Sequence, residues 1–225
     1  MLSPEEALTR YLAAKQKVKN LTIVGIAGPG DALANWPLVK ETIGRIKDVD
    51  REAQFCLSTN GLLLPELVDE LKATGINFLT ITVNALDPRV GRKIYRYVHW
   101  QGKDVSGEAG FQILSRNQQN GIRMAVERGI ICKVNAVVMA GINDTCIRPI
   151  AAQAASLRCY LFNAISLIPV QGSEFEHIPV MDKGKIHSIR QQCGDFIKQM
   201  YHCQRCRADA IGCLKDHAAT GPYVI

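Results

Sequence analysis

The chain has 225 residues, enough for one large domain or at most two small ones. Its hydrophobic fraction of 47% can fill a complete core, and its charged fraction of 21% is ordinary for a soluble protein. The net charge of +6 is spread along the chain rather than gathered in one block, so we expect no nucleic-acid partner. No apolar run approaches the roughly 20 residues that span a bilayer, so we expect no membrane partner.

The predicted elements alternate between helices and short apolar strands. A capping box formed by Ser3 and Glu6 begins a first helix that is expected to end near residue 17. Apolar runs rich in β-branched residues predict strands at 21–27, 54–58, 78–83, 131–139 and 160–167. Helical spacing predicts further helices at 37–47, 63–74, 108–128, 147–157 and 182–200. We expect Gly75 to end one helix, Gly121 to weaken another, and the polar and aromatic stretch 88–107 to be irregular.

This alternation, with a period of about 30 residues, predicts a parallel sheet covered by helices. A doubly wound sheet and a barrel both fit the pattern. In either fold the loops that follow the strands carry the chemistry. Polar residues and glycines gather at those positions: Gly28, Gly30, Asp31, Ser58, Asn60, Asn84, Asn135, Asn143 and Asp144.

The glycine-rich loop at 28–31 has two interpretations. It could be a simple tight turn, or its glycines could let the backbone approach a ligand while Asp31 pairs with an ammonium group. It is not a phosphate loop, because neither the GxxxxGK[ST] pattern nor a helix-opening GxGxxG pattern is present.

Cysteine usage suggests metal chemistry in a reducing, cytoplasmic setting. Met1 leads into Ser3-Pro4-Glu5-Glu6, which reads as a helix start rather than an export segment. Cys203 and Cys206 are three positions apart, a spacing at which two thiols can bind one metal. Spacing alone leaves zinc, iron–sulfur and an idle pair open, and a zinc site would need further ligands from Cys193, His202 or Cys213.

The remaining cysteines have a simpler local interpretation. Cys132 and Cys159 lie inside apolar runs and are expected to be small buried core residues. Taken locally, Cys56 also fits a core cysteine at a strand end.

Six segments, in this order, resemble segments of the radical SAM enzymes that build the nitrogenase cofactor precursor. They are GIAGPGD (25–31), CLSTNGL (56–62), TVNA (82–85), VNAV (134–137), GIND (141–144) and CQRCRADA (203–210). Each segment alone is a weak signal, but six in the same order are specific. The resemblance runs from about residue 2 to residue 217, nearly the whole chain.

The resemblance implies a partial (β/α)6 barrel of the TIM type. It implies S-adenosylmethionine (SAM) and [4Fe-4S] clusters as cofactors, and a radical fusion of two further [4Fe-4S] clusters with carbide insertion. Cys56 matches a ligand of one substrate cluster, and Cys203 and Cys206 match ligands of the other. The implied partners are proteins of nitrogenase assembly that donate clusters and accept the precursor. The implied SAM-binding residues are Gly28, Gly30, Asp31, Ser58, Asn60, Asn84 and Asn135.

The chain departs from the family pattern at one decisive point. These enzymes bind their reducing cluster through Cys-x3-Cys-x2-Cys, and no two cysteines here are four positions apart. We therefore expect an incomplete barrel core at 1–200, without the first strand and cluster loop, followed by a cysteine-containing tail at 201–225. Such a chain is expected to be inactive by itself. The alternatives are a non-catalytic iron–sulfur carrier and a zinc-stabilised α/β scaffold.

Overall fold

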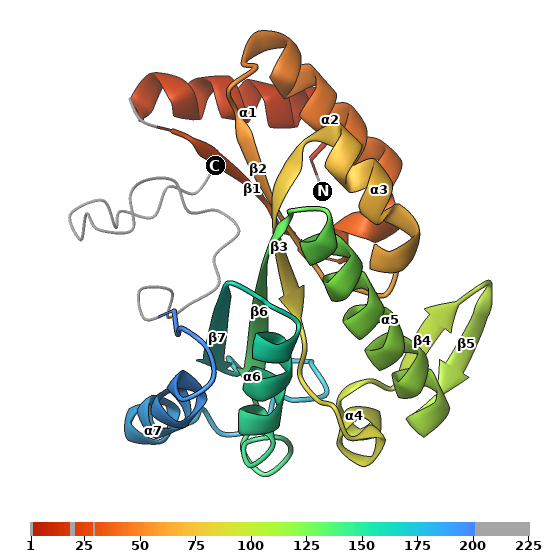
Figure 1. Ribbon diagram of the computed structural model, residues 1–225, viewed down its shortest axis with the longest axis vertical. Helices are drawn as coiled ribbons and strands as arrows, with labels where there is room; N and C mark the ends of the chain where they lie inside the picture. The colour runs from red at the N-terminus through yellow and green to blue at the C-terminus, as the bar shows by residue number, and fades with distance from the viewer. Residues whose placement is uncertain (1, 19–20, 29, 201–225) are drawn as a thin grey trace.

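The computed structural model describes residues 2–18, 21–28 and 30–200 of the chain. Within them, five parallel strands form one sheet in the order β1-β2-β3-β6-β7 (Figure 1). These strands are β1 (Ile23–Ile26), β2 (Gln54–Thr59), β3 (Ile76–Thr82), β6 (Ile131–Val138) and β7 (Leu161–Ser166). The helices are α1 (Pro4–Lys17), the short 3-10 helix η1 (Ala32–Asn35), α2 (Trp36–Val49), α3 (Leu64–Thr74), α4 (Pro88–Ile94), α5 (Gly107–Glu127), α6 (Ile147–Ser156) and α7 (Lys183–Gly194). Among the described residues, no helix is long and apolar enough to cross a membrane.

The strand order identifies the architecture. Each strand of the sheet pairs in parallel with the next one along the chain, so the order never reverses. A doubly wound sheet needs such a reversal at its switch point, and right-handed crossovers in one direction place the helices on one face. The chain therefore forms an open, partial TIM-type barrel, which confirms the predicted fold class and excludes the doubly wound alternative.

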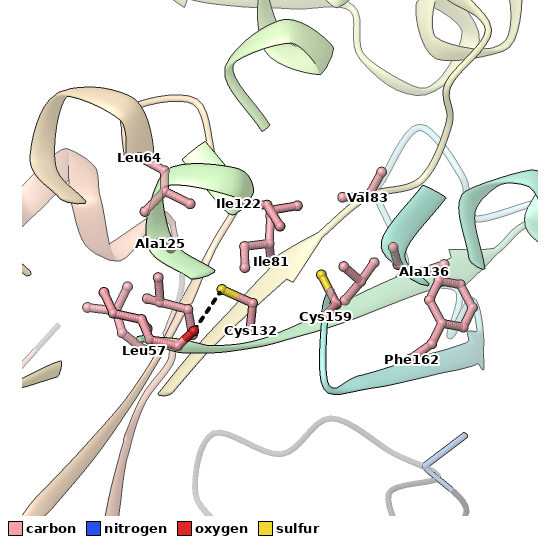
Figure 2. Packing of buried hydrophobic residues seen from close by; sticks show 14 of the residues in the cluster. Leu57, Leu64, Ile81, Val83, Ile122, Ala125, Cys132, Ala136, Cys159 and Phe162 are labelled. Carbon is pink, nitrogen blue, oxygen red and sulfur yellow. Dashed lines mark hydrogen bonds between the residues drawn. The ribbon is translucent and has the colours of Figure 1, made fainter. Parts of the chain in front are cut away.

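The main core lies between the sheet and these helices. Figure 2 shows Ile122 and Ala125 of α5 close to the strand residues Leu57 and Ile81, and each of the four is at most 2% exposed. Burying a large aliphatic side chain contributes about 1.5–3 kcal/mol, so this layer is the main source of stability. Because these apolar side chains all face the helices, the opposite face of the sheet is left for other residues.

Two cysteines belong to this core, as predicted. Cys132 and Cys159 are 1% and 8% exposed and lie among the apolar side chains of the cluster (Figure 2). Burial raises the pKa of each thiol to about 12, so both stay protonated at neutral pH. They are packing residues and cannot serve as thiolate ligands.

Local signals placed several helix ends correctly. The Ser3 hydroxyl accepts from the Glu6 N–H at 3.2 Å, and the Glu6 carboxylate accepts from the Ser3 N–H at 2.7 Å. Gly75 ends α3 in the left-handed conformation, with φ of 87°. Gly121 does not weaken α5, which is continuous there. A Cβ at this position would lie 2.7 Å from Leu64 Cβ, so the glycine lets α5 approach α3 closely.

The segment 88–107 is not irregular, which corrects the prediction. It forms α4 and an antiparallel hairpin of β4 (Tyr97–Trp100) and β5 (Lys103–Ser106), which packs on α5 away from the main sheet (Figure 1). Gln101 and Gly102 make the two-residue turn, both with positive φ, as a type I′ turn requires. A second, smaller core of Ala85, Val98, Phe111 and Leu114 holds this unit together.

The last predicted helix is also shorter than expected. Instead of continuing to residue 200, α7 ends at Gly194. The chain then runs beside the free edge of β7, where the Phe162 N–H donates to the Lys198 carbonyl at 3.0 Å and the Met200 N–H donates to the Phe162 carbonyl at 2.9 Å. Satisfying the unpaired backbone groups of an edge strand outweighs the helical preference of this segment.

Candidate functional site

The candidate site lies on the face of the sheet turned away from the helices, which we call the inner face. Along β2, buried side chains alternate with more exposed ones, and the more exposed ones are Gln54, Cys56 and Ser58. The same alternation on β6 places four side chains on the inner face, namely Ile131, Lys133, Asn135 and Val137. Three predicted site residues, Cys56, Ser58 and Asn135, therefore share one surface.

Cys56 is a free, half-buried thiol on the inner face rather than a core residue. Its Sγ lies 3.8 Å from Thr80 Oγ1 on the neighbouring strand β3. A thiol in this polar, partly accessible position can bind a soft metal, unlike the buried thiols of Cys132 and Cys159. Cys56 is therefore not a core cysteine, and its role as a cluster ligand stays a prediction.

The loop that follows β1 lies at the carboxyl edge of the sheet. Gly28 and Gly30 are exposed, and an added Cβ would meet nothing within 4 Å at either, so a ligand has room beside this backbone. The Asp31 carboxylate, in contrast, already accepts several hydrogen bonds from the protein. It accepts from the Leu33 N–H at 2.9 Å, from the Thr59 hydroxyl at 3.0 Å and from the Asn60 N–H.

These bonds give Asp31 a structural role that the sequence did not indicate. Its carboxylate caps η1 and fastens the loop after β1 to the end of β2. The oxygens expected to meet an ammonium group thus already accept hydrogen bonds from the protein. Asp31 fixes the position of the glycine backbone, and direct contact with a ligand stays a prediction.

Two of the predicted asparagines brace the same edge. Asn60 Oδ1 accepts from the Leu62 N–H at 2.8 Å and so shapes its own turn. Asn84 is 7% exposed and joins two strands, because its Oδ1 accepts from the Val137 N–H at 2.9 Å. The Asn84 amide also donates to the Tyr95 hydroxyl at 3.1 Å. Both amides therefore hold the protein together at the site.

Ser58 and Asn135 are freer. Within the described part of the chain, the Ser58 hydroxyl has no hydrogen-bond partner, and the Asn135 Oδ1 accepts only from Asn163 Nδ2 at 3.4 Å. Strand pairing places Ser58 beside Thr80, and Asn135 beside Thr82. Ser58 and Asn135 therefore both have unused hydrogen-bonding capacity on the inner face.

Two further amides at this edge were not recognised as structural residues from the sequence. Gln118 of α5 is 2% exposed, and its Nε2 donates to the carbonyls of Asn60 at 2.7 Å and Thr82 at 2.9 Å. Asn143, in the loop before α6, is 0% exposed and bonds to three backbone groups of the edge. A buried polar residue at a core-facing helix position is a signal that could have identified Gln118.

The described residues do not fit a resident iron–sulfur cluster. They contain no group of three histidine, cysteine or acidic side chains that could hold a metal. Cys203 and Cys206 lie outside the described residues. Cys193, considered as a further zinc ligand, is 0% exposed in the core, and burial raises the pKa of its thiol to about 11. Cys193 is therefore not available to a zinc site.

The family can now be assigned. Residues 1–154 match the family model of the Radical SAM superfamily, and five parallel strands in sequential order agree with that match. The chain belongs to the Radical SAM superfamily.

Within that superfamily, the chain is similar to proteins of nitrogenase cofactor assembly. It is 36% identical over 218 residues to the FeMo cofactor biosynthesis protein NifB of Klebsiella pneumoniae, covering 95% of this chain and 47% of that protein. It is 38% identical over 222 residues to NifB of Frankia alni, covering 95% of this chain and 44% of that protein. The resemblance inferred from the six segments is thus confirmed, and the chain spans less than half the length of these relatives.

Solved structures share the fold at low sequence identity. Streptococcus suis SuiB bound to S-adenosylmethionine superposes with a TM-score of 0.62 at 13% identity, covering 92% of this chain and 44% of that one. Methylornithine synthase (PylB) superposes with a TM-score of 0.61 at 15% identity, covering 88% of this chain and 55% of that one. At such identities the likeness shows the barrel fold alone.

Proposed function

We propose that this chain works in the biosynthesis of the nitrogenase FeMo cofactor, in the radical SAM step that fuses two [4Fe-4S] clusters and inserts a carbide. The observation that carries the proposal is the position of Cys56, a free thiol on the inner face in contact with the Thr80 hydroxyl. The similarity to NifB over 95% of the chain supports the substrate class. Proteins that donate clusters and accept the precursor would then be its partners.

The two substrate clusters would be held at different points of the chain. Cys56 would bind one cluster over the inner face, and Cys203 with Cys206 would bind the other. Met200, whose backbone pairs with β7, has its Sδ 3.7 Å from Lys133 Nζ. Cys203 follows Met200 by three residues, which span at most about 11 Å when extended, and Cys206 follows it by six.

SAM would bind across the carboxyl edge of the sheet and the adjoining part of the inner face. The open backbone at Gly28 and Gly30 would receive one end of the molecule, and Ser58 and Asn135 have free hydrogen-bonding capacity for the other. Bound SAM would supply the radical chemistry and the carbon. The contribution of Asp31, Asn60 and Asn84 would be to keep these groups in place, through the hydrogen bonds described above.

The chain by itself is proposed not to cleave SAM. Its 225 residues contain no Cys-x3-Cys-x2-Cys, and the described residues contain no group of three histidine, cysteine or acidic side chains that could hold the reducing cluster instead. This observation also favours a second candidate function, a carrier that binds a cluster without radical chemistry. 5′-Deoxyadenosine released from the purified chain with dithionite and SAM would contradict the proposed inactivity.

The division into a core of 1–200 and a tail of 201–225 stays a prediction.

Anaerobic reconstitution with iron and sulfide tests the proposed site. We expect bound cluster in the parent chain, partial loss in Cys56→Ala, partial loss in a Cys203→Ala/Cys206→Ala double variant, and complete loss in the triple variant. Cys146→Ala is the matched control, because Cys146 is also half-buried and free but lies outside the sheet, directly before α6. Equal cluster content in the parent and in Cys56→Ala would contradict the assignment of Cys56. Stoichiometric zinc in the chain as purified would favour the scaffold alternative.

A further inference from the structure

Lys133 differs from the other residues of the sheet in its charge. Among the residues of the five described strands, β1, β2, β3, β6 and β7, it is the one charged side chain. Its neighbours along β6, Cys132 and Val134, are each 1% exposed in the main core, so Lys133 points to the inner face. An ammonium group in the middle of a sheet is costly unless something compensates its charge.

Nothing in the described part of the chain supplies that compensation. No carboxylate of the described residues forms an ion pair with Lys133, and its Nζ contacts the thioether of Met200 at 3.7 Å. A thioether is a weak acceptor without charge. The ammonium group of half-buried Lys133 therefore has N–H donors that no described residue accepts. An anion bound over the inner face would accept these hydrogen bonds and balance the charge.

The register places this charge diagonally across β3 from the candidate ligand Cys56. Lys133 on β6 pairs with Thr80 on β3, and the Thr80 hydroxyl lies 3.8 Å from Cys56 Sγ. Cys56 pairs with Phe78, two residues before Thr80, so Cys56 and Lys133 lie diagonally across β3, with the Thr80 side chain between them. A ligand bonded to Cys56 and lying over Thr80 would meet the flexible lysine side chain.

We propose that Lys133 is a positioning residue that holds, by charge, the anionic iron–sulfur cluster bound to Cys56. The inference rests on the proposed function and adds a residue to it. A cluster with thiolate ligands is negatively charged, and charge-assisted hydrogen bonds to its sulfur atoms also favour its reduced form. The carboxylate of SAM offers the same anionic chemistry. Lys133 and Thr80 are level with Ser58, but the Thr80 hydroxyl contacts Cys56 Sγ, and this contact favours the cluster.

The test uses the 225-residue chain carrying Cys203→Ala and Cys206→Ala, so that any cluster depends on Cys56. Lys133→Met removes the charge at similar volume, Lys133→Arg keeps it, and Lys103→Met on the exposed strand β5 is the matched control. After anaerobic reconstitution, iron retained against a chelator and the cluster's reduction potential are measured. Equilibrium dialysis against SAM and far-UV circular dichroism are recorded for each variant.

We expect Lys133→Met to lower iron retention about tenfold or more, as loss of an outer partner of a metal site does. Its residual cluster should have a more negative reduction potential, because the reduced form loses a stabilising cation. Lys133→Arg and Lys103→Met should match the parent. Lys133→Gln, which keeps a polar side chain, replaces Lys133→Met if the circular dichroism of the latter shows misfolding.

Three results would overturn the inference, and they differ from one another. Retention and potential in Lys133→Met equal to those of Lys103→Met would remove Lys133 from the site while leaving Cys56 as a ligand. Loss of SAM binding with an unchanged cluster would assign the lysine to the carboxylate of SAM. A parent chain that retains no more iron than Cys56→Ala would refute the proposed function at Cys56, and the role of Lys133 with it.

Discussion

Replacing Asn143 with alanine is expected to loosen the carboxyl edge of the sheet. Asn143 is 0% exposed, and its Oδ1 accepts from the Met139 N–H at 2.7 Å. Its Nδ2 donates to the carbonyls of Asn84 at 2.8 Å and Val137 at 2.9 Å. One amide thus ties the end of β3 to the end of β6, and alanine would leave all three backbone groups without this partner.

The expected cost follows from the number of bonds. Each net hydrogen bond contributes about 1 kcal/mol, so Asn143→Ala should lower the free energy of unfolding by roughly 3 kcal/mol. With a urea m-value of about 2 kcal/mol per molar, the midpoint of unfolding should fall by about 1.5 M. Urea titration followed by circular dichroism measures this shift. Asn120→Ala is the control, because Asn120 accepts one surface bond from Arg123, at 2.9 Å, and its loss should stay within about 0.5 kcal/mol.

A second substitution separates bonding from volume. Asn143→Asp keeps the side-chain shape and the acceptor for Met139, but it sets a carboxylate oxygen against two carbonyl oxygens. We expect it to be at least as destabilising as alanine. If Asn143→Asp unfolds at the parent midpoint, or if Asn143→Ala costs less than about 1 kcal/mol, then the amide does not brace this edge.

Two further predictions concern packing and pH. Gly121→Ala should lower the free energy of unfolding by about 1 kcal/mol despite alanine's higher helix propensity, because the new Cβ would lie 2.7 Å from Leu64 Cβ; unchanged or higher stability in urea would refute the close approach of α5 to α3. Cys132 and Cys159 have folded-state pKa values of about 12, above that of an unfolded thiol, so the folded chain binds more protons in alkaline solution. The two protonated thiols therefore contribute fully to the free energy of unfolding below about pH 8.5, and this contribution is lost as the pH rises toward 12. Urea titrations at several pH values should show this loss, and it should be smaller in Cys132→Ala and Cys159→Ala; a slope identical to the parent's would show that these thiols are not responsible.

Signals confined to a few neighbouring residues predicted local structure well. The five strands of the main sheet were predicted from short runs rich in β-branched and apolar residues, because the face of each strand that packs on the helices needs such side chains. The capping box of Ser3 and Glu6 and the left-handed Gly75 were predicted for the same kind of reason. The hydrogen bonds of both caps join residues within one turn of the chain.

Signals failed where distant segments supply the stabilising contacts. The hairpin of β4 and β5 turns at Gln101 and Gly102, and glutamine is not a residue that marks a left-handed turn. Its stability comes from a separate small core in which the Tyr95 and Phe111 rings stack with centroids 5.8 Å apart. Likewise, α7 stops at Gly194 because the following residues complete the edge of β7.

The order of residues along the chain was sufficient to establish a repeating strand–helix protein, its superfamily and a set of candidate residues at strand ends. It could not choose between a doubly wound sheet and a barrel, because the pairing order of strands depends on contacts across the whole chain. Nor could it separate residues by role. Cys56, Ser58 and Asn135 face the open side of the sheet, whereas Asp31 and Asn84 are occupied by backbone groups from other loops. The reason is physical: a side chain is available for a ligand only when the folded neighbours around it leave its polar atoms unpaired.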